Sequence, residues 1–221
     1  MLDVRVLGGL ALTLHGQRIH PPRRRKATTL LVWSVVEHPG ILRRKDAAIA
    51  LFPDVDPPRA LASLRLQIHC LREWLGLVGG NPDWLVIDDE SLRWAPDALG
   101  FVDAATFAQR CATVAAAEGP GLSLAVGQAA IGAAELYLGD LLPGEYAEPI
   151  VALRSRFHAL HRWLVERLCQ HVGVDCPPRV NRSPAHEPGN DDGRDGDDFS
   201  ALIQTLVNAG EGAAATALVT S

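Results

Sequence analysis

The segment LASLRLQIHCLREWL, residues 61–75, decides the fold class of this 221-residue chain. Its large apolar residues recur every three or four positions, which places them on one side of a helix. They are Leu61, Leu64, Ile68, Leu71 and Leu75. Polar residues fill most of the other positions. The segment therefore predicts an amphipathic helix with its apolar side on the protein core and its polar side outward.

Two shorter helices are predicted before this segment. One β-hairpin is predicted before the three helices in the sequence and another after them. The first helix runs over about residues 27–38 and ends at Pro39-Gly40. The second helix runs over about residues 43–52 and ends at Pro53. Apolar residues alternate over residues 2–14, and again over 84–94 around an acidic turn. Strands, three helices and a hairpin, in that order, are typical of a winged helix.

The pattern changes along the chain and predicts four regions. Residues 1–98 are expected to form the winged helix, and the Ala-rich residues 99–172 a helical-repeat domain of TPR-like type, for which a plain bundle would look similar. Residues 173–198 are rich in Pro, Gly, Asn and Asp, which predicts a disordered linker. A short helix is expected over 199–221. The predicted fold class is mainly α with small β.

The composition indicates a cytoplasmic protein and gives no sign of an enzyme. Residues 1–6 lack a secretory signal, and no apolar run is long enough to span a membrane. No phosphate-binding loop or hydrolase motif is present in the sequence, so neither catalysis nor a cofactor is expected. No metal is expected either, because the four cysteines contain no Cys-x-x-Cys pair. They are Cys70, Cys111, Cys169 and Cys176.

Basic side chains gather in the N-terminal part, although the net charge of the chain is −5. Between Arg18 and Arg72 the chain holds 11 basic and 4 acidic residues. A nucleic-acid-binding surface requires such a local excess of positive charge, whatever the net charge. The alternative is that these residues form a plain solvated surface, as basic runs commonly do.

Several stretches of the chain together carry a family resemblance. They are LDVRVLG (2–8), PRRRKA (22–27), HPG (38–40), LFPD (51–54), ASLR (62–65) leading to HCLR (69–72), VD (102–103) with Phe107, and LYLGDLLPG (136–144). In this order they resemble the antibiotic-regulatory-protein (SARP) type of bacterial activator over about residues 1–172. The resemblance implies a response-regulator-like winged helix followed by a bacterial transcriptional activator (BTAD) domain. It also implies DNA binding at direct repeats, side by side, and contact with RNA polymerase.

Three features depart from the family pattern. Cys70 stands where the family usually has a basic DNA contact, and Arg43 stands where a Ser or Thr commonly caps the second helix. Loss of such a cap typically costs about 1 kcal/mol of stability. The helices of the family's BTAD domain continue beyond about Gly173, where this chain changes composition. The interaction domain is therefore expected to be truncated or divergent.

The polar side of residues 61–75 and its flanks supply the predicted contacts with double-stranded DNA, because the major groove admits one helix. Ser63 and Gln67 are predicted to read base edges, and Arg65 and Arg72 to contact phosphates. Phosphate contacts are also predicted for the basic run Arg23, Arg24, Arg25 and Lys26. The other predicted DNA contacts are Arg43, Arg44, Lys45, Arg59, His69 and Arg93.

Several of these residues have a structural alternative. The stem of Arg72 also fits a position over the core leucines, and residues 43–45 fit a solvated surface equally well. His69 fits a plain surface position better than a pH switch. Leu66, exposed in this arrangement, would touch a thymine methyl group or a neighbouring subunit.

Two functions follow from these residues. The first is a DNA-binding transcription regulator, by resemblance an activator, that binds repeated promoter sites as a homodimer and contacts RNA polymerase. The alternative is a protein-interaction module that has the winged-helix shape and has lost strong DNA binding. Cys70 and the acidic net charge favour the alternative, and the run Arg23–Lys26 argues against it.

Overall fold

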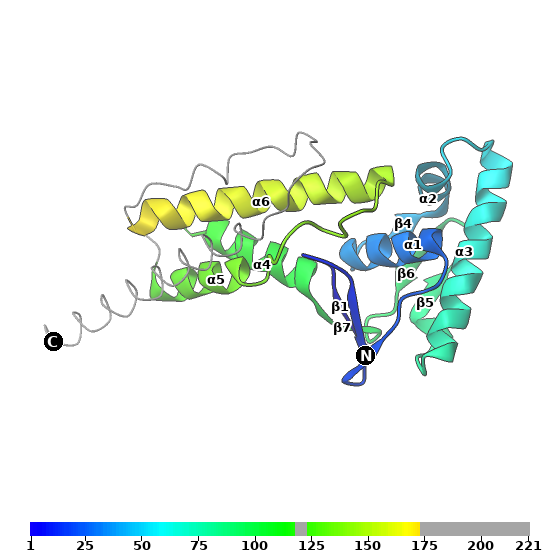
Figure 1. The fold of residues 1–221 in the computed structure, drawn as a ribbon, viewed down its shortest axis with the longest axis horizontal. Coiled ribbons are helices and arrows are strands. Elements are labelled where there is room, and N and C mark those ends of the chain that lie inside the picture. The colour runs from blue at the N-terminus through cyan, green and yellow to red at the C-terminus, as the bar shows by residue number, and fades with distance from the viewer. Residues whose placement is uncertain (118–122, 173–221) are drawn as a thin grey trace, which may run out of the picture. The chain divides into compact units, whose positions relative to one another are not determined.

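The computed structural model describes residues 1–117 and 123–172, which are mainly helical with two small sheets (Figure 1). The prediction of a mainly α protein with small β is confirmed. Contacts divide the described residues into two compact units, the first formed by Met1–Thr106 with Tyr137–Phe157. The predicted limits 1–98 and 99–172 stay a prediction. The linker and helix predicted over 173–221 lie outside the described residues.

The first sheet belongs to the first unit and has the strand order β3-β2-β1-β7. Its strands are β1 (Leu2–Arg5), β2 (Ala11–Leu14), β3 (Gln17–Ile19) and β7 (Leu99–Val102). β1 pairs with β2 in the antiparallel direction, as the alternating pattern predicts, and Leu2 lies opposite Leu14. β7 pairs with β1 in parallel, a pairing that the sequence pattern does not reveal because the two strands lie far apart in the chain.

Asp103 fixes the helix that follows β7 to the first strand of the sheet. Its carboxylate accepts hydrogen bonds from the backbone amides of Val6 and Leu7 at 2.9–3.0 Å, and from that of Ala104 at 2.7 Å. Burial raises the pKa of Asp103, and the hydrogen bonds from Leu7 and Val6 oppose this effect. The side chain therefore joins two segments that lie almost a hundred residues apart.

Three helices and a second sheet lie between β3 and β7 in the chain. The helices are α1 (Arg25–Val36), α2 (Arg44–Leu51) and α3 (Pro57–Leu77). The sheet has the order β4-β6-β5, with β4 (Leu42–Arg43), β5 (Leu85–Ile87) and β6 (Ser91–Trp94), and the short 3-10 helix η1 (Pro82–Trp84) precedes β5. The predicted hairpin is therefore present, and β4 adds a strand that the sequence did not indicate.

The predicted amphipathic segment is the centre of α3. The helix begins four residues earlier than its apolar stripe because Pro57 and Pro58 fit its first turn, where no intrahelical N–H bond is needed. Four of the five stripe residues are buried, and Leu61 is half buried. The stripe packs toward α1 and α2. One buried polar contact joins this core to the hairpin, since the Trp94 indole donates to the Ser34 hydroxyl at 3.0 Å.

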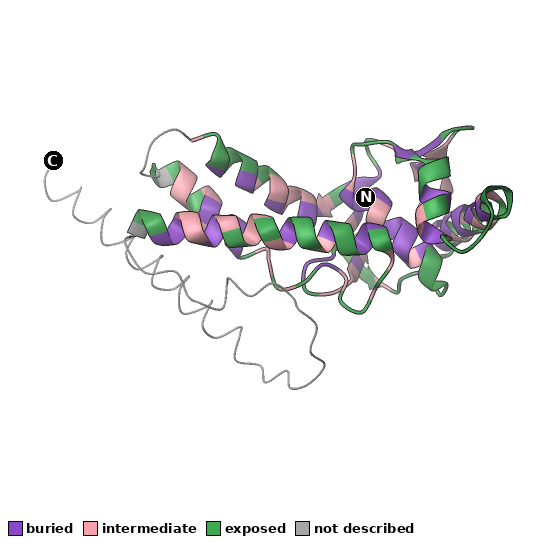
Figure 2. Ribbon diagram, turned by 90° about the horizontal axis from the view of Figure 1, so that it is seen from above, coloured by how far each residue is buried: buried purple, intermediate pink, exposed green. Residues whose placement is uncertain are grey.

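Three further helices are α4 (Asp103–Ala115), α5 (Leu124–Ala134) and α6 (Glu148–Val172). The second unit takes the described residues of Phe107–Leu136 and those from His158 onward. Its core gathers one side of each helix: Phe107, Cys111, Val114, Ala130, Ala133, Ala134, Leu164, Val165, Leu168 and Cys169. Figure 2 shows buried and exposed residues alternating along α6, as expected for an amphipathic helix. No described helix has the length and apolar character that crossing a bilayer requires.

Candidate nucleic-acid interface

The side of α3 opposite the core is exposed to solvent. We call this side the outer stripe, and it consists of Arg59, Ala62, Arg65, Leu66, His69 and Glu73. Each of these residues lies three or four positions from at least one other, so they share one broad side of the helix. No other part of the described chain covers them. The major groove of DNA is wide enough to admit one α-helix, and the free side of α3 could lie in it.

The charged side chains of the outer stripe make only weak contacts with the rest of the chain. Arg59 lies 3.4 Å from the Asp56 carboxylate, and the His69 imidazole lies 3.4 Å from the Glu73 carboxylate, all four of them largely exposed. Arg65 forms no ion pair with any described residue. Exposed ion pairs contribute little to stability, so the Arg59 and Arg65 guanidinium groups are available to an external anion.

Gln67 does not lie where the sequence analysis expected it. Its side chain is only 6% exposed, and its amide donates to the Ser63 carbonyl at 3.4 Å. The reason is helical geometry: position 67 is three residues from Leu64 and four from Leu71, so it faces the core. The prediction that Gln67 projects from the side of the helix was therefore wrong. Ser63 is half buried at the edge of the outer stripe.

Arg72 is half exposed and is paired with a residue of the same chain at the protein surface. Its guanidinium lies 2.6 Å from the Asp83 carboxylate and donates to the Pro82 carbonyl at 3.3 Å. These contacts hold α3 against η1. The packing of the Arg72 stem over the core leucines stays a prediction. Because Arg72 is paired with Asp83, Arg65 is the freer of the two predicted phosphate contacts on this helix.

The basic run at the start of α1 divides into two pairs. Arg23 and Arg24 are exposed and form no ion pair with a described residue. Lys26 donates to the Leu51 carbonyl at 2.7 Å, which places its positive charge at the carboxyl end of α2, where the helix dipole favours it. Arg25 is paired with Glu145 and is described next.

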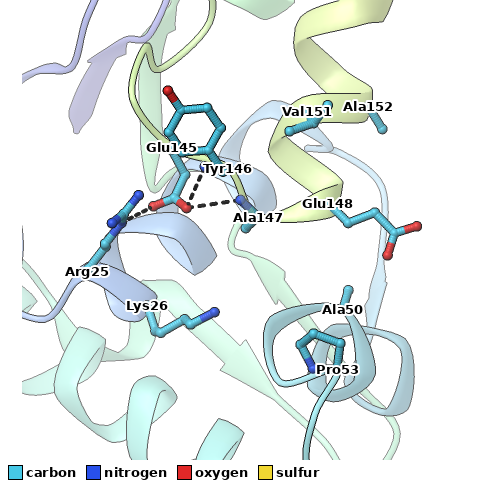
Figure 3. A pocket seen from close by; sticks show the side chains of 10 residues that line it. All are labelled: Arg25, Lys26, Ala50, Pro53, Glu145, Tyr146, Ala147, Glu148, Val151 and Ala152. Atoms are coloured by element: carbon cyan, nitrogen blue, oxygen red, sulfur yellow. Dashed lines mark hydrogen bonds and ion pairs between the residues drawn. The ribbon is translucent and has the colours of Figure 1, made fainter.

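Glu145 is the centre of a hydrogen-bonded cluster beside a hollow of about 660 Å³ (Figure 3). Its carboxylate accepts from the Arg25 guanidinium at 2.9 Å and from the Thr29 hydroxyl at 3.0 Å. It also accepts from the amides of Tyr146 and Ala147 at 3.0 Å. Burial raises the pKa of Glu145, but the hydrogen bonds from Arg25, Ala147 and Thr29 outweigh it and hold the pKa below its usual value.

The basic residues Arg43, Arg44 and Lys45 at the start of α2 also differ in whether they are bonded within the chain. Arg43 and Lys45 are exposed, as is Arg93 on β6. Arg44 instead donates to the carbonyls of Asp88 and Asp89 at 2.6 and 3.3 Å. It therefore acts as a brace between α2 and the hairpin turn.

The turn of the β5–β6 hairpin is acidic. Asp88, Asp89 and Glu90 are all exposed there. Hydrogen bonds from the Ser91 hydroxyl and from the amides of Glu90 and Ser91 lower the pKa of Asp88 below its usual value. Three carboxylates at a hairpin tip repel phosphates, so a contact of this hairpin with DNA would rest on Arg93.

Neither a known family pattern nor a curated protein sequence matches the chain. Among solved structures, EmbR of Mycobacterium tuberculosis, in complex with a low-affinity phosphopeptide, matches with a TM-score of 0.54 and 24% sequence identity. The match covers 78% of this chain and 47% of the EmbR chain, so this chain spans about half of the length of EmbR. The likeness is one of fold.

The geometry adds three things that sequence patterns did not supply. Glu145 neutralises Arg25 from 120 residues away, and no local signal marks such a partner. Asp83 forms an ion pair with Arg72. The acidic turn was visible in the sequence, but its meaning depends on its place at the tip of the hairpin. Among the described residues, no group of side chains is arranged to hold a metal ion.

Proposed function

We propose that the protein is a DNA-binding transcription regulator whose residues 1–98 form a winged helix. The observation that carries this proposal is the outer stripe of α3, a free helix side that bears Arg59 and Arg65 while the opposite side packs in the core. A winged helix places such a helix in the major groove, with its N-terminal residues on the base edges. Arg65, Arg59 and Ser63 lie in this half of α3.

Exposed cations outside α3 support the same proposal. Arg23, Arg24, Arg43, Lys45 and Arg93 are exposed, and we assign them to phosphates. Each phosphate contact adds about 0.9 to the slope of log affinity against log salt concentration on duplex DNA. Arg25, Lys26, Arg44 and Arg72 contribute less, because their charges are already used within the chain.

The family assignment and the partners belong to the same proposal. The fold likeness to EmbR and the sequence resemblance together favour a SARP-type regulator with a shortened BTAD, TPR-like helical part. We propose that it acts in the cytoplasm as an activator, that two copies bind a repeated promoter site, and that the bound protein contacts RNA polymerase. No catalytic step is assigned to it.

Selection from a random duplex pool followed by titration tests the proposal. The full chain is used to enrich duplexes, and the affinity for the enriched duplex is measured by fluorescence anisotropy for the wild type, Arg65→Ala and Arg162→Ala. Arg162 is a half-exposed arginine of α6 that lies 3.9 Å from Glu166. Its substitution removes the same positive charge as Arg65→Ala but leaves α3 unchanged. We expect enrichment of one sequence, a large loss for Arg65→Ala and a small one for Arg162→Ala. Absence of enrichment, or equal losses, contradicts DNA recognition by α3.

A protein-interaction module without strong DNA binding is the second candidate. The acidic hairpin turn and the half-buried Cys70 on α3 favour it. The substitution Cys70→Arg separates the two candidates, because it restores a positive charge beside the outer stripe. A regulator gains affinity for duplex DNA, whereas an interaction module shows no DNA signal before or after the change.

A further inference from the structure

We infer that Ala62 and Leu66 read the methyl groups of thymines in the major groove, which makes Leu66 a specificity-determining residue. The inference rests on the proposed function and names the DNA that this helix prefers. It predicts a binding site that contains at least one thymine whose 5-methyl group contributes to affinity.

The first argument is the position of the two residues. Ala62 and Leu66 lie one helical turn apart at the centre of the outer stripe, and both are exposed, Leu66 by 44%. Both lie in the N-terminal half of α3, the part of a recognition helix that meets base edges. An apolar pair therefore occupies the place at which base contacts are made.

The second argument is the shortage of hydrogen-bonding side chains at this place. Gln67 is buried, and Ser63 is half buried at the edge of the stripe. Arg65 lies on the other edge of the stripe, where it is directed toward a flank rather than the centre. The side chains of Ala62 and Leu66 have neither donor nor acceptor, and, apart from Arg65, the nearest polar residues of the stripe are Arg59 and His69. Recognition at positions 62 and 66 therefore rests on apolar contact. In the major groove the thymine methyl group is the apolar feature that distinguishes one base from the others.

The third argument concerns the occupant of this surface. The outer stripe carries two arginines, Arg59 and Arg65, against one glutamate, Glu73, so a second copy of α3 placed face to face on it would bring two surfaces of net positive charge together, and like charges repel. A nucleic acid instead meets the same arginines with phosphates. The charge of the stripe therefore favours DNA over a second copy of the chain.

The test removes one methyl group at a time. In the duplex enriched by the full chain, each thymidine is replaced in turn by deoxyuridine, which differs only by the 5-methyl group. Affinities are measured for the wild type, Leu66→Ala and the control Leu77→Ala, a residue that is 87% exposed at the carboxyl end of α3. For the wild type and Leu77→Ala, we expect about a fourfold loss at one or two positions, the effect of exposing one methyl-sized group. At the thymidine that Leu66 contacts, Leu66→Ala should bind the thymidine and deoxyuridine duplexes with affinities that agree within a factor of two.

Several outcomes overturn the inference. A duplex that is enriched but insensitive to deoxyuridine at every position refutes thymine reading and leaves DNA binding intact. An unchanged deoxyuridine effect in Leu66→Ala assigns the methyl contact to another residue. A dimer of the wild type that Leu66→Ala converts to a monomer, measured by sedimentation without DNA, assigns the surface to a second copy. Failure to enrich any duplex removes both the inference and the proposed function.

Discussion

The Arg25 guanidinium and the Glu145 carboxylate lie 2.9 Å apart across 120 residues of sequence. Glu145 is largely buried, while Arg25 remains largely exposed. Arg25 belongs to the basic run that the sequence assigns to DNA phosphates, so the carboxylate and a phosphate would compete for the same guanidinium. The structure thus limits how much of this run is free for DNA.

Substitution of Glu145 should release Arg25. For Glu145→Gln we expect tighter binding to the enriched duplex and a salt slope steeper by about 0.9, equal to one added phosphate contact. Glu148→Gln is the matched control, because Glu148 is exposed beside the same hollow and has no bond to Arg25. Anisotropy titrations at several salt concentrations measure both variants. An equal gain in DNA affinity in the two variants would mean that the change in net charge, and not the release of Arg25, causes it.

The pH dependence of stability follows from the lowered pKa of Glu145. A carboxylate with a lowered folded pKa stabilises the protein above its unfolded pKa, here 4.5, and this contribution is lost as the pH falls through the folded value. The wild type should therefore be more stable than Glu145→Gln at pH 7, and the difference should shrink below about pH 4.5. Urea unfolding midpoints from pH 3 to 7 measure it. A difference that is constant over this range contradicts the assignment.

Removal of the Asp103 carboxylate should destabilise the first unit. Asp103→Ala leaves the buried amides of Val6 and Leu7 without the acceptor they have in the structure, and a buried donor without a partner costs about 1–3 kcal/mol. Asp103→Asn retains one acceptor oxygen and should lose less. The free energy of unfolding in urea is the measurement. Equal stability of the wild type and Asp103→Ala would show that these hydrogen bonds contribute nothing.

The orientation of α3 predicts opposite outcomes for two neighbouring leucines. Leu64 is fully buried and Leu66 is 44% exposed. Leu64→Ala should cost about 2–5 kcal/mol of stability through lost burial and a cavity. Leu66→Ala should stay within about 0.5 kcal/mol of the wild type, as surface substitutions usually do. Thermal or urea unfolding tests the pair, and a reversed order would mean that the helix faces the other way.

The apolar stripe of α3 could be predicted because helical periodicity is a local property of the sequence. The same periodicity also places Gln67 next to the core side, but its polar character predicted a position at the exposed flank, and the structure buries it. Pairing between β1 and β7 has no local signal at all. For the candidate site, the exposed positions Arg65 and Leu66 follow from the stripe, whereas the partners Glu145 and Asp83 come from distant contacts.

The most direct test of the central claim is a crosslink between DNA bases and α3. The thymidines of the enriched duplex are replaced by 5-bromodeoxyuridine, the complex with the full chain is irradiated, and crosslinked tryptic peptides are identified by mass spectrometry. The account predicts crosslinks in the peptides of residues 60–65 and 66–72, which carry Ala62 and Leu66. Crosslinks confined to α6 or to the hairpin turn, with none in α3, would contradict it.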